Sequence, residues 1–152
     1  MVDDPGIVRS MCPKDVKSIV AIEPDEFTLI YPERVYVNHA RVFPKLSLVV
    51  ETKNTISAFI IGSTSVSDDA FYGHISSIYV LEEYRKRGYG SRLINKFEEG
   101  CKKAGCRYIN LYVNIRNIAA VDFYKNRKYT VYRTIPKYYN DAEDAYEMRR
   151  DL

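Results

Sequence analysis

A basic turn with two glycines stands between an apolar segment and a helical segment of this sequence. The turn is Arg85-Lys86-Arg87-Gly88-Tyr89-Gly90-Ser91, and the apolar segment before it, residues 75–80, has the composition of a strand. The first N–H groups of a helix have no partner inside the helix and form its positive end, and glycine lets a ligand approach the backbone. The sequence therefore predicts an anion site suited to phosphate at residues 85–91.

The turn also has plainer interpretations, and its spacing excludes two of them. It is no P-loop, because the Gly-x-x-x-x-Gly-Lys-[Ser/Thr] pattern is missing, and no dinucleotide fingerprint, because only two of the three glycines are present. A solvated basic turn remains, which is the commoner case for a basic triplet alone. A second motif favours the anion site, namely Asn117-Ile118-Ala119-Ala120-Val121-Asp122-Phe123-Tyr124, which begins the next helical segment.

Together, the two motifs resemble the acetyl-CoA site of the GNAT acetyltransferase superfamily, in which Arg/Gln-x-x-Gly-x-Gly/Ala follows a strand and Asn-x-x-Ala-x-x-x-Tyr comes later in the chain. Two further segments narrow the resemblance to protein N-terminal acetyltransferases of the Ard1 and RimI type. They are Gly73-His74-Ile75-Ser76-Ser77-Ile78 and the C-terminal segment 136–152, with Tyr138-Tyr139 and Glu143-Asp144-Ala145-Tyr146-Glu147-Met148. The likeness extends from residue 46 to residue 152.

The resemblance implies an enzyme that moves the acetyl group of acetyl-CoA, its co-substrate, to the α-amino group of a protein or peptide N-terminus. We expect direct attack in a ternary complex without a metal, because no nucleophile is placed for a covalent acetyl-enzyme. An α-amine titrates near 7.7–8.0 and a lysine amine near 10.4, so a neutral lysine costs about 3.5 kcal/mol more at pH 7. Acetylation of a lysine or small-molecule amine, and a CoA-binding module without turnover, are the alternatives.

Cofactor-binding residues are implied position by position. The backbone of Ile78 and Val80 would bind the pantetheine arm, and the amides of residues 87–91 would hold the pyrophosphate. Tyr124 would lie beside the sulfur and donate a proton or hydrogen bond to the leaving thiolate. The full implied set is Ile78, Tyr79, Val80, Arg85, Lys86, Arg87, Gly88, Tyr89, Gly90, Ser91, Asn117 and Tyr124.

The resemblance also implies residues for the substrate and for proton removal. Tyr138 and Tyr139 would lie on a hairpin that covers the peptide, and Glu33 would face the first residue of the peptide. His74 and Tyr112 would hold a water that accepts the amine proton, because a histidine of pKa near 6.5 is mostly neutral at pH 7.5. Glu33 is the next candidate for the base. Taken alone, one histidine or any one of 14 tyrosines is more often structural.

Two departures from the family pattern stand out. Asn114 occupies the position where eukaryotic relatives usually have an arginine, so any substrate role of that arginine is lost or replaced. Relatives often end the second motif with Leu-Gly-Phe, whereas this chain has Asn126-Arg127-Lys128-Tyr129. The geometry of that turn is therefore the less certain part of the resemblance.

These residues need an α/β scaffold to bring them together. The periodicity predicts the order β-α-α-β-β-β-α-β-α-β-β, a mixed central sheet with helices on both faces, as in the GNAT fold. The expected strands are residues 7–11, 46–50, 55–63, 72–81, 108–113, 129–135 and 145–149. The expected helices are residues 13–22, 33–41, 91–104 and 117–124.

Length and composition fit this scaffold. A chain of 152 residues suits a single domain, residues 1–152. With 23 Lys and Arg against 20 Asp and Glu, the net charge of +3 argues against direct nucleic-acid reading. Three cysteines without a metal-knuckle spacing, and no apolar run of membrane length, predict a cytoplasmic protein without a membrane partner. The sequence leaves open the preferred N-terminal residues, the oligomeric state, and a ribosome or auxiliary subunit as partner.

Overall fold

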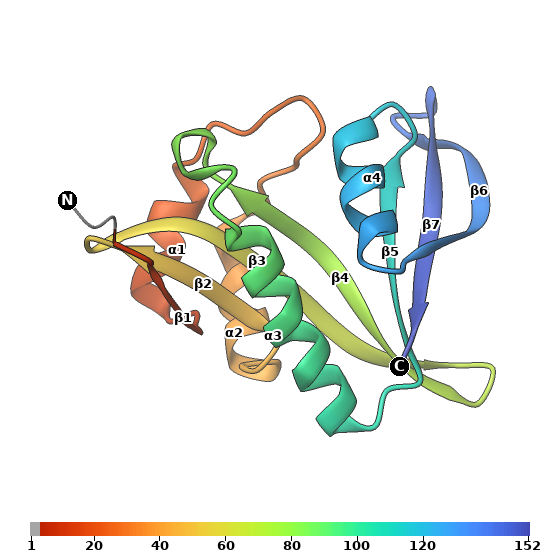
Figure 1. Ribbon diagram of the computed structural model, residues 1–152, viewed down its shortest axis with the longest axis horizontal. Coiled ribbons are helices and arrows are strands. Elements are labelled where there is room, and N and C mark those ends of the chain that lie inside the picture. Colours follow the sequence, from red (N-terminus) through yellow and green to blue (C-terminus); the bar gives the residue numbers. More distant parts are fainter. Residues whose placement is uncertain (1–3) are drawn as a thin grey trace.

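The computed structural model describes residues 4–152, which fold in the predicted order of elements (Figure 1). The strands are β1 Ile7–Ser10, β2 Ser47–Thr52, β3 Thr55–Ser67, β4 Ala70–Val80, β5 Tyr108–Asn114, β6 Thr130–Tyr139 and β7 Glu143–Asp151. The helices are α1 Pro13–Val20, α2 Glu33–Val42, α3 Tyr89–Ala104 and α4 Ile118–Asn126, with a 3₁₀ turn at Glu82–Tyr84.

The strands form one mixed sheet in the spatial order β1-β2-β3-β4-β5-β7-β6. β4 and β5 are parallel, and every other neighbouring pair is antiparallel. The last strand of the chain, β7, lies between β5 and β6. The α/β class and the mixed sheet expected from the sequence are confirmed.

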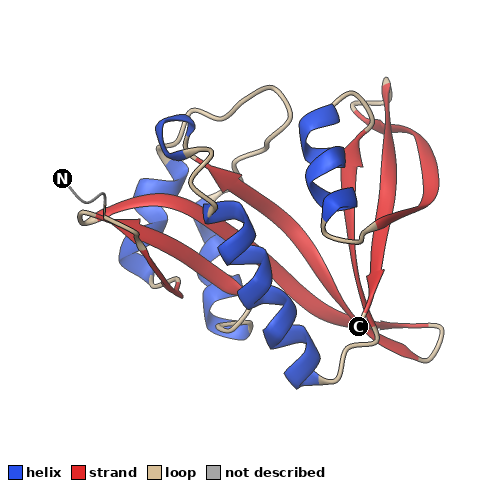
Figure 2. Cartoon of the chain, in the orientation of Figure 1, coloured by secondary structure: helices blue, strands red, loops and turns tan. Residues whose placement is uncertain are grey.

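Helices cover both faces of the sheet (Figure 2). On one face, α3 and α4 pack on a core that includes Leu93, Phe97, Val121 and Tyr124. On the other face, α1 and α2 pack on a smaller core around Phe59. Fully burying one such apolar side chain stabilises the fold by roughly 1.5–3 kcal/mol. The second core is formed by α1, α2, β2, β3 and Tyr79 of β4, and among residues 4–152 it includes no residue of β5, β7 or β6.

β4 and β5 pair only at Tyr72–Ile75, opposite Tyr108–Leu111, and part beyond that point. A β-bulge lies at the place where they separate. On β3, Ile61 pairs with Ser77 and Gly62 pairs with Ile75, so Ser76 is the extra residue. A side chain at Gly62 would meet the His74 carbonyl and the Phe97 ring, so only glycine fits beside this bulge.

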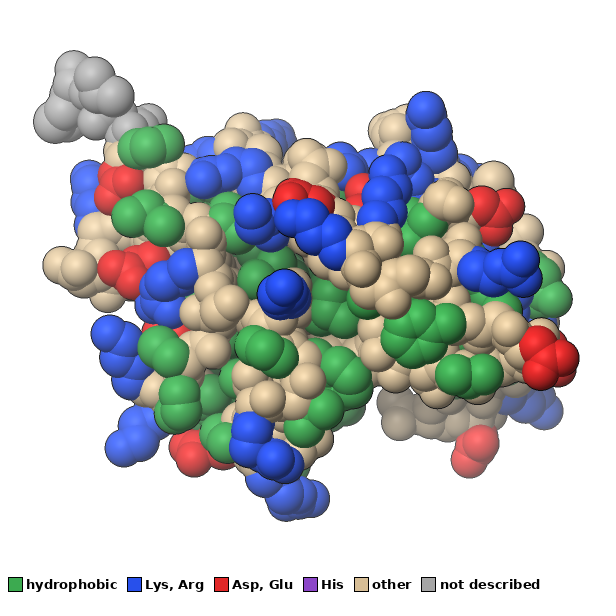
Figure 3. Space-filling model, turned by 90° about the horizontal axis from the view of Figure 1, so that it is seen from below, with side chains coloured by type: hydrophobic (Ala, Val, Ile, Leu, Met, Phe, Trp, Pro, Cys, Tyr) green, Lys and Arg blue, Asp and Glu red, His purple; other side chains and the backbone are tan. Residues whose placement is uncertain are grey.

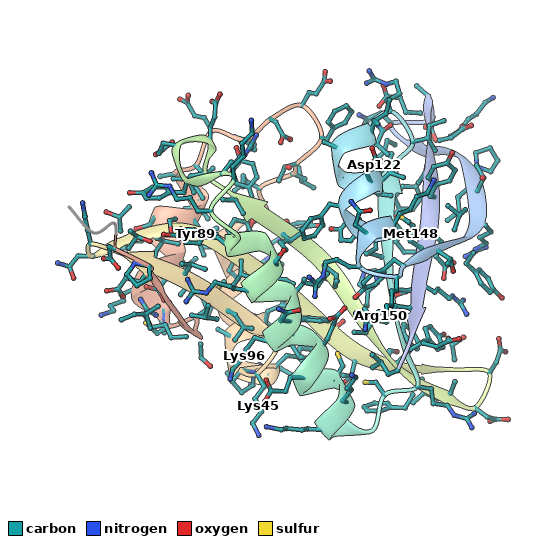
Figure 4. All side chains as sticks on the ribbon, viewed as in Figure 1. Lys45, Tyr89, Lys96, Asp122, Met148 and Arg150 are labelled. Atoms are coloured by element: carbon teal, nitrogen blue, oxygen red, sulfur yellow. The ribbon has the colours of Figure 1, made fainter. Side chains whose placement is uncertain are left out.

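A buried ionic cluster joins the two halves of the sheet beneath α3. Glu98 of α3 accepts hydrogen bonds from the Tyr129 hydroxyl at 2.8 Å, from Arg150 of β7 at 3.0 Å and from Arg127 at 3.2 Å. Figure 4 shows Arg150 between β7 and α3. Burial, followed by the nearby Glu98 charge, raises the pKa of Tyr129 far above its ordinary value, so its phenol remains a donor. The cluster connects α3, the turn after α4, and β7.

Three details differ from or clarify the sequence expectations. The β3–β4 hairpin is longer than the sequence predicts. Ser63–Ser67 lacks the apolar alternation that marks a strand, but it pairs with β4 in the structure. β6 continues through Pro136, which is tolerated because β6 is the edge strand and its register shifts between Ile135 and Tyr139. Lys128 adopts φ 71°, the left-handed conformation that a glycine would supply in the turn after α4.

The surface and the helices add two observations. On the face shown in Figure 3, the described Lys and Arg side chains are scattered among acidic and hydrophobic ones. Within residues 4–152, no helix is both long enough and apolar enough to cross a bilayer.

Candidate active site

A cavity of about 860 Å³ opens where β4 and β5 part. It is lined by the parted segments of both strands, by α4, by the β6–β7 hairpin and by the loop between α1 and α2. Clefts of this size at a break in sheet pairing are common ligand sites. The cavity therefore passes between the two halves of the sheet.

One wall of the cavity is an unpaired strand edge. The Leu81 N–H donates to the Ser57 carbonyl of β3 at 2.9 Å, so by the two-residue period the backbone groups of Ile78 and Val80 face away from β3. Both residues line the cavity. The Val80 carbonyl accepts a hydrogen bond from Arg85 Nε at 2.9 Å. This edge can hydrogen-bond an extended ligand as a further strand would.

Arg85 links this edge to the loop between α1 and α2. Its guanidinium lies 3.6 Å from Asp25 and 5.3 Å from the centroid of the Tyr79 ring. Arg85, Asp25 and Tyr79 all line the cavity. The side chain of Arg85 thus braces the loop against β4.

The glycine-containing turn begins α3. Gly88 is the N-cap in a left-handed conformation at φ 80°, and a Cβ there would meet nothing within 4 Å. Because Arg92 N–H is the first amide to bond back to the Gly88 carbonyl, the N–H groups of Tyr89, Gly90 and Ser91 have no partner in the helix. Lys86 and Arg87 lie in the same turn. The arrangement is an open helix N-terminus suited to an anion.

The side chain of Tyr89 does not face this turn. Tyr89 is buried at the start of α3 (Figure 4), where its hydroxyl donates to the Asp4 carbonyl at 3.3 Å and accepts from Thr52 at 3.2 Å. Of Tyr89, only the backbone is available to a ligand. The cofactor-binding expectation for this residue is thereby limited to its amide.

Asn117 and Tyr124 stand at the two ends of the α4 wall, and both line the cavity. Asn117 caps α4, its side-chain oxygen accepting from the Ala120 N–H at 3.3 Å. Tyr124 is 6% exposed. Burial, and then the neighbouring Tyr139, raise the pKa of Tyr124 well above its ordinary value, so its phenol keeps its proton at neutral pH.

A row of rings lines the opposite end of the cavity. His74 lies 5.6 Å from Tyr112, Tyr112 stacks on Tyr138 at 5.1 Å, and Tyr138 meets Tyr139 edge-on at 4.8 Å, all measured between ring centroids. All four residues line the cavity. Burial, followed by Tyr138, raises the pKa of Tyr139 to about 12, so this phenol is neutral as well. The structure thus brings the sequence-predicted His74, Tyr112, Tyr138 and Tyr139 together.

His74 has a defined hydrogen-bond partner on the neighbouring strand. Its Nδ1 lies 2.8 Å from Asn110 Oδ1. Burial lowers the pKa of His74 below its ordinary value, outweighing the opposite effects of Asn110 and Glu147. The imidazole is therefore neutral at pH 7.

The structure does not bring Glu33 to the cavity. It is exposed at the first residue of α2, outside the lining residues, so a role for it remains a prediction. The carboxylates that do line the cavity are Asp25, Glu26 and Glu143. Glu143 begins β7 and belongs to the C-terminal segment of the resemblance, whereas no sequence pattern marked Asp25 and Glu26, which lie in the irregular loop between α1 and α2.

Asn114 sits where relatives have an arginine, and it is hydrogen-bonded. Its amide donates to Glu143, and its Oδ1 accepts from the Arg116 N–H at 2.9 Å. The Arg116 guanidinium also pairs with Glu143. Arg116, two residues further along the chain, thus places a basic side chain beside Asn114 and Glu143.

Comparison with known proteins identifies the class. The model of the acetyltransferase (GNAT) family matches residues 16–129. The chain therefore belongs to the GNAT acetyltransferase family, and acetyl transfer is the chemistry of that class.

Individual relatives narrow the comparison to one branch. The chain is 33% identical over 126 residues to the N-alpha-acetyltransferase daf-31 of Caenorhabditis elegans, covering 80% of this chain and 69% of that protein. It is similar in structure to Naa20 of Chaetomium thermophilum in complex with a bisubstrate analogue, with TM-score 0.90, 29% identity, and coverage of 96% and 86%. Ard1 from Thermoplasma volcanium gives TM-score 0.87 and 28% identity, with coverage of 97% and 98%. The chain is thus similar to Nα-acetyltransferases along almost all of its length.

Proposed function

We propose that this protein transfers the acetyl group of acetyl-CoA to the α-amino group of protein N-termini. One observation carries the proposal. A single cavity is lined by the unpaired β4 edge and Tyr124 and also by the row of rings from His74 to Tyr139. A thioester bound along the β4 edge and an amine that enters past the row of rings would meet inside this cavity, between the parted strands.

The cofactor would lie along two features, the start of α3 and the unpaired edge of β4. The amides at the start of α3 would hold the pyrophosphate, with Arg87 and Lys86 adding positive charge. The backbone of Ile78 and Val80 would pair with the amides of the pantetheine arm, as in strand addition. The Val80 carbonyl already accepts a hydrogen bond from Arg85. The second lone pair of this oxygen and the N–H of Val80 therefore remain for the ligand.

The reaction is proposed to proceed by direct attack. The neutral amine nitrogen bonds to the acetyl carbonyl carbon, the carbon–sulfur bond breaks, and CoA leaves as a thiolate. A water between His74 and Tyr112 would take the amine proton, and Tyr124 would give a proton or a hydrogen bond to the sulfur. Among the three cysteines, Cys101 and Cys106 are buried, and burial raises the pKa of each, which argues against a covalent acetyl-enzyme.

The peptide end of the cavity favours a protein N-terminus over a bulky free amine. Tyr138 and Tyr139 line the cavity together with the loop residues Phe27, Leu29 and Tyr31. An α-amine needs only a weak base, which fits a histidine of lowered pKa. A cytoplasmic location is part of the proposal, since three free thiols suit a reducing compartment.

The decisive experiment incubates the purified chain with acetyl-CoA and peptides that vary in their first two residues. We expect thiol release and a mass gain of one acetyl group on the α-amine. A peptide blocked at its N-terminus but carrying a free lysine is the control, and acetylation of that peptide would favour the lysine alternative. Acetyl-CoA binding with no thiol release from any peptide, in the presence or absence of ribosomes, would favour a binding module instead.

A further inference from the structure

A buried chain of hydrogen bonds between side chains connects His74 of β4 to Glu147 of β7. His74 Nδ1 lies 2.8 Å from Asn110 Oδ1, and Asn110 Nδ2 lies 3.3 Å from Glu147 Oε2. Asn110 is 5% exposed and Glu147 is 1% exposed. The chain runs from β4 across β5 to β7, away from the cavity. Neither Asn110 nor Glu147 has a role in the mechanism proposed above.

We propose that Asn110 and Glu147 are positioning residues that hold His74 in a single tautomer, with the proton on Nδ1 and a free lone pair on Nε2. This inference rests on the proposed role of His74 as the base. Neither residue touches the substrate in the proposal. They act on the reaction only through the imidazole.

The bonding rules of the three groups fix the direction of every proton in the chain. A carboxylate only accepts, so Asn110 must present its NH₂ group to Glu147. Asn110 then presents its oxygen to His74, and an amide oxygen only accepts. Nδ1 of His74 must therefore donate, and Nε2 is left as the acceptor.

Two arginines keep Glu147 ionised at the far end of the chain. Arg133 Nε donates to Oε1 at 2.7 Å, and Arg149 Nε donates to Oε2 at 2.7 Å. Burial alone would raise the pKa of Glu147, but the hydrogen bonds from Arg133, Arg149 and Asn110 outweigh it and hold the pKa below its ordinary value. Arg149 is itself fixed between the rings of Tyr108 and Tyr132, at 4.5 Å and 3.5 Å from their centroids.

The groups around His74 act on its charge in opposite directions. Glu147 on β7, through Asn110 on β5, favours the imidazolium, whereas burial and His39 on α2 disfavour it. The rings of Tyr112 on β5 and Tyr138 on β6 follow His74 in the row of rings, and Arg133 on β6 is paired with Glu147. The net result is a neutral base at rest that Glu147 stabilises when it takes up a proton.

A spectroscopic test needs no turnover. The chain has two histidines, so long-range ¹H–¹⁵N correlation spectra show two imidazoles, and a His39→Gln variant assigns them. We expect His74 as the Nδ1–H tautomer in the wild type. Asn110→Leu should mix the tautomers and lower the pKa of His74, because the hydrogen bond that favours its charged form is lost. The Nε2–H tautomer in the wild type would overturn the proposal.

Asn114→Leu is the matched control for the cost of removing a buried amide. Asn114 lies four residues further along β5, and its amide bonds to Glu143 rather than to the His74 chain. We expect the His74 tautomer and pKa to stay unchanged in this variant. An equal change in both variants would show a general disturbance of β5 and would contradict a specific link through Asn110.

Kinetics provide the second test, and Glu147→Gln is the variant because it keeps the shape of the side chain. The rate falls on the acid side as His74 becomes protonated. Removing the Glu147 charge lowers the pKa of His74, so the acidic limb of the kcat profile should move to lower pH. The kcat plateau should fall several-fold, with KM for acetyl-CoA nearly unchanged. An unmoved limb in a folded Glu147→Gln enzyme would contradict the proposal.

A double-mutant cycle separates this inference from the function on which it rests. His74→Ala should remove the acidic limb, and adding Asn110→Leu to His74→Ala should cost no further activity. Full additivity of the two losses would show that Asn110 acts elsewhere. If the wild type acetylates no peptide, the proposed function fails, while the tautomer measurement still decides on Asn110 and Glu147.

Discussion

The segment of β4 that pairs with β5, Tyr72–Ile75, is tightly packed at its start and reaches the cavity only at its last two residues, whereas all of the segment beyond it, residues 76–80, borders the cavity. In the paired segment, Tyr72 stacks on Tyr108 with 5.1 Å between ring centroids, and a Cβ on Gly73 would lie 2.5 Å from the Cys101 sulfur. In the parted segment, backbone groups that would have completed a ladder face a space for ligand. The site thus arises because the sheet leaves one strand edge unpaired.

The boundary between the two segments carries the polar chemistry. His74 is in the paired segment, one residue before its end, and the bulge at Ser76 follows at once. Its partner Asn110 is directly opposite on β5. The paired segment thus fixes the orientation of the His74 imidazole, which acts in the cavity.

The largest effect is expected at Tyr124 of α4, which lines the cavity together with the parted segment. Tyr124→Phe should lower kcat by about 10²-fold, or roughly 2.7 kcal/mol in activation free energy, if the phenol assists the leaving thiolate. Acetyl-CoA affinity should stay nearly unchanged, because the ring remains. Steady-state kinetics and calorimetric titration measure the two quantities. A fully active Phe variant would reduce Tyr124 to a packing role.

At the packed start of the paired segment, a substitution at Gly73 should change stability rather than activity. Gly73→Ala places a methyl group against Cys101, and such overpacking costs about 1–3 kcal/mol of unfolding free energy. Urea unfolding measures the loss. Adding Cys101→Ala should recover part of it, because the clashing sulfur is gone. If Gly73→Ala instead left stability intact and lowered kcat, the distinction between the two segments would be wrong.

At the anion site, Gly88→Glu should weaken acetyl-CoA binding about tenfold, or roughly 1.4 kcal/mol, through clash and charge. Gly105→Glu is the matched control at the other end of α3. Both glycines have positive φ, 80° and 90°, and neither has an atom within 4 Å of an added Cβ. Both variants should lose similar stability, about 1–2 kcal/mol, from the strained conformation. Equal acetyl-CoA affinities in a titration would exclude the site at Gly88.

The smallest effect is expected at Tyr112. Tyr112→Phe keeps the stacking on Tyr138 and the contact with His74, and it removes only the hydroxyl that would orient the water. The rate should fall a few-fold, less than in His74→Ala, and the acidic limb should stay in place because His74 still titrates. A pH–rate profile compares the two variants. Loss of the limb in Tyr112→Phe would assign the titrating group to the tyrosine instead.

Much of the scaffold was predictable because local signals agree. The period of two in β2, β3 and β4, the apolar face of α3 and the left-handed Gly105 after it gave the element order correctly. The motifs at Arg85 and Asn117 placed two walls of the cavity for the same reason: each depends on a helix start, which is a local feature.

The remaining features depend on contacts distant in sequence. Asn110 and Glu147 meet only because β7 inserts between β5 and β6, an order that no local pattern encodes. Their one signal was a polar residue within an apolar strand, as in Ile109-Asn110-Leu111. The acidic lining at Asp25 and Glu26 lies in an irregular loop that carries no pattern, whereas Glu33, which the resemblance implies, lies at the exposed start of α2.

The Glu98 cluster has a mechanical consequence for ligand capture. It connects α3, which covers one half of the sheet, to Arg150 and Tyr129 in the other half, and so links the two sides of the cavity. Separation of the two halves of the sheet would remove the hydrogen-bond partners of the buried Glu98 carboxylate, which would cost about 3–5 kcal/mol of stability. We therefore expect the cavity to keep nearly the same width with and without the cofactor, so that the pantetheine arm enters a preformed channel.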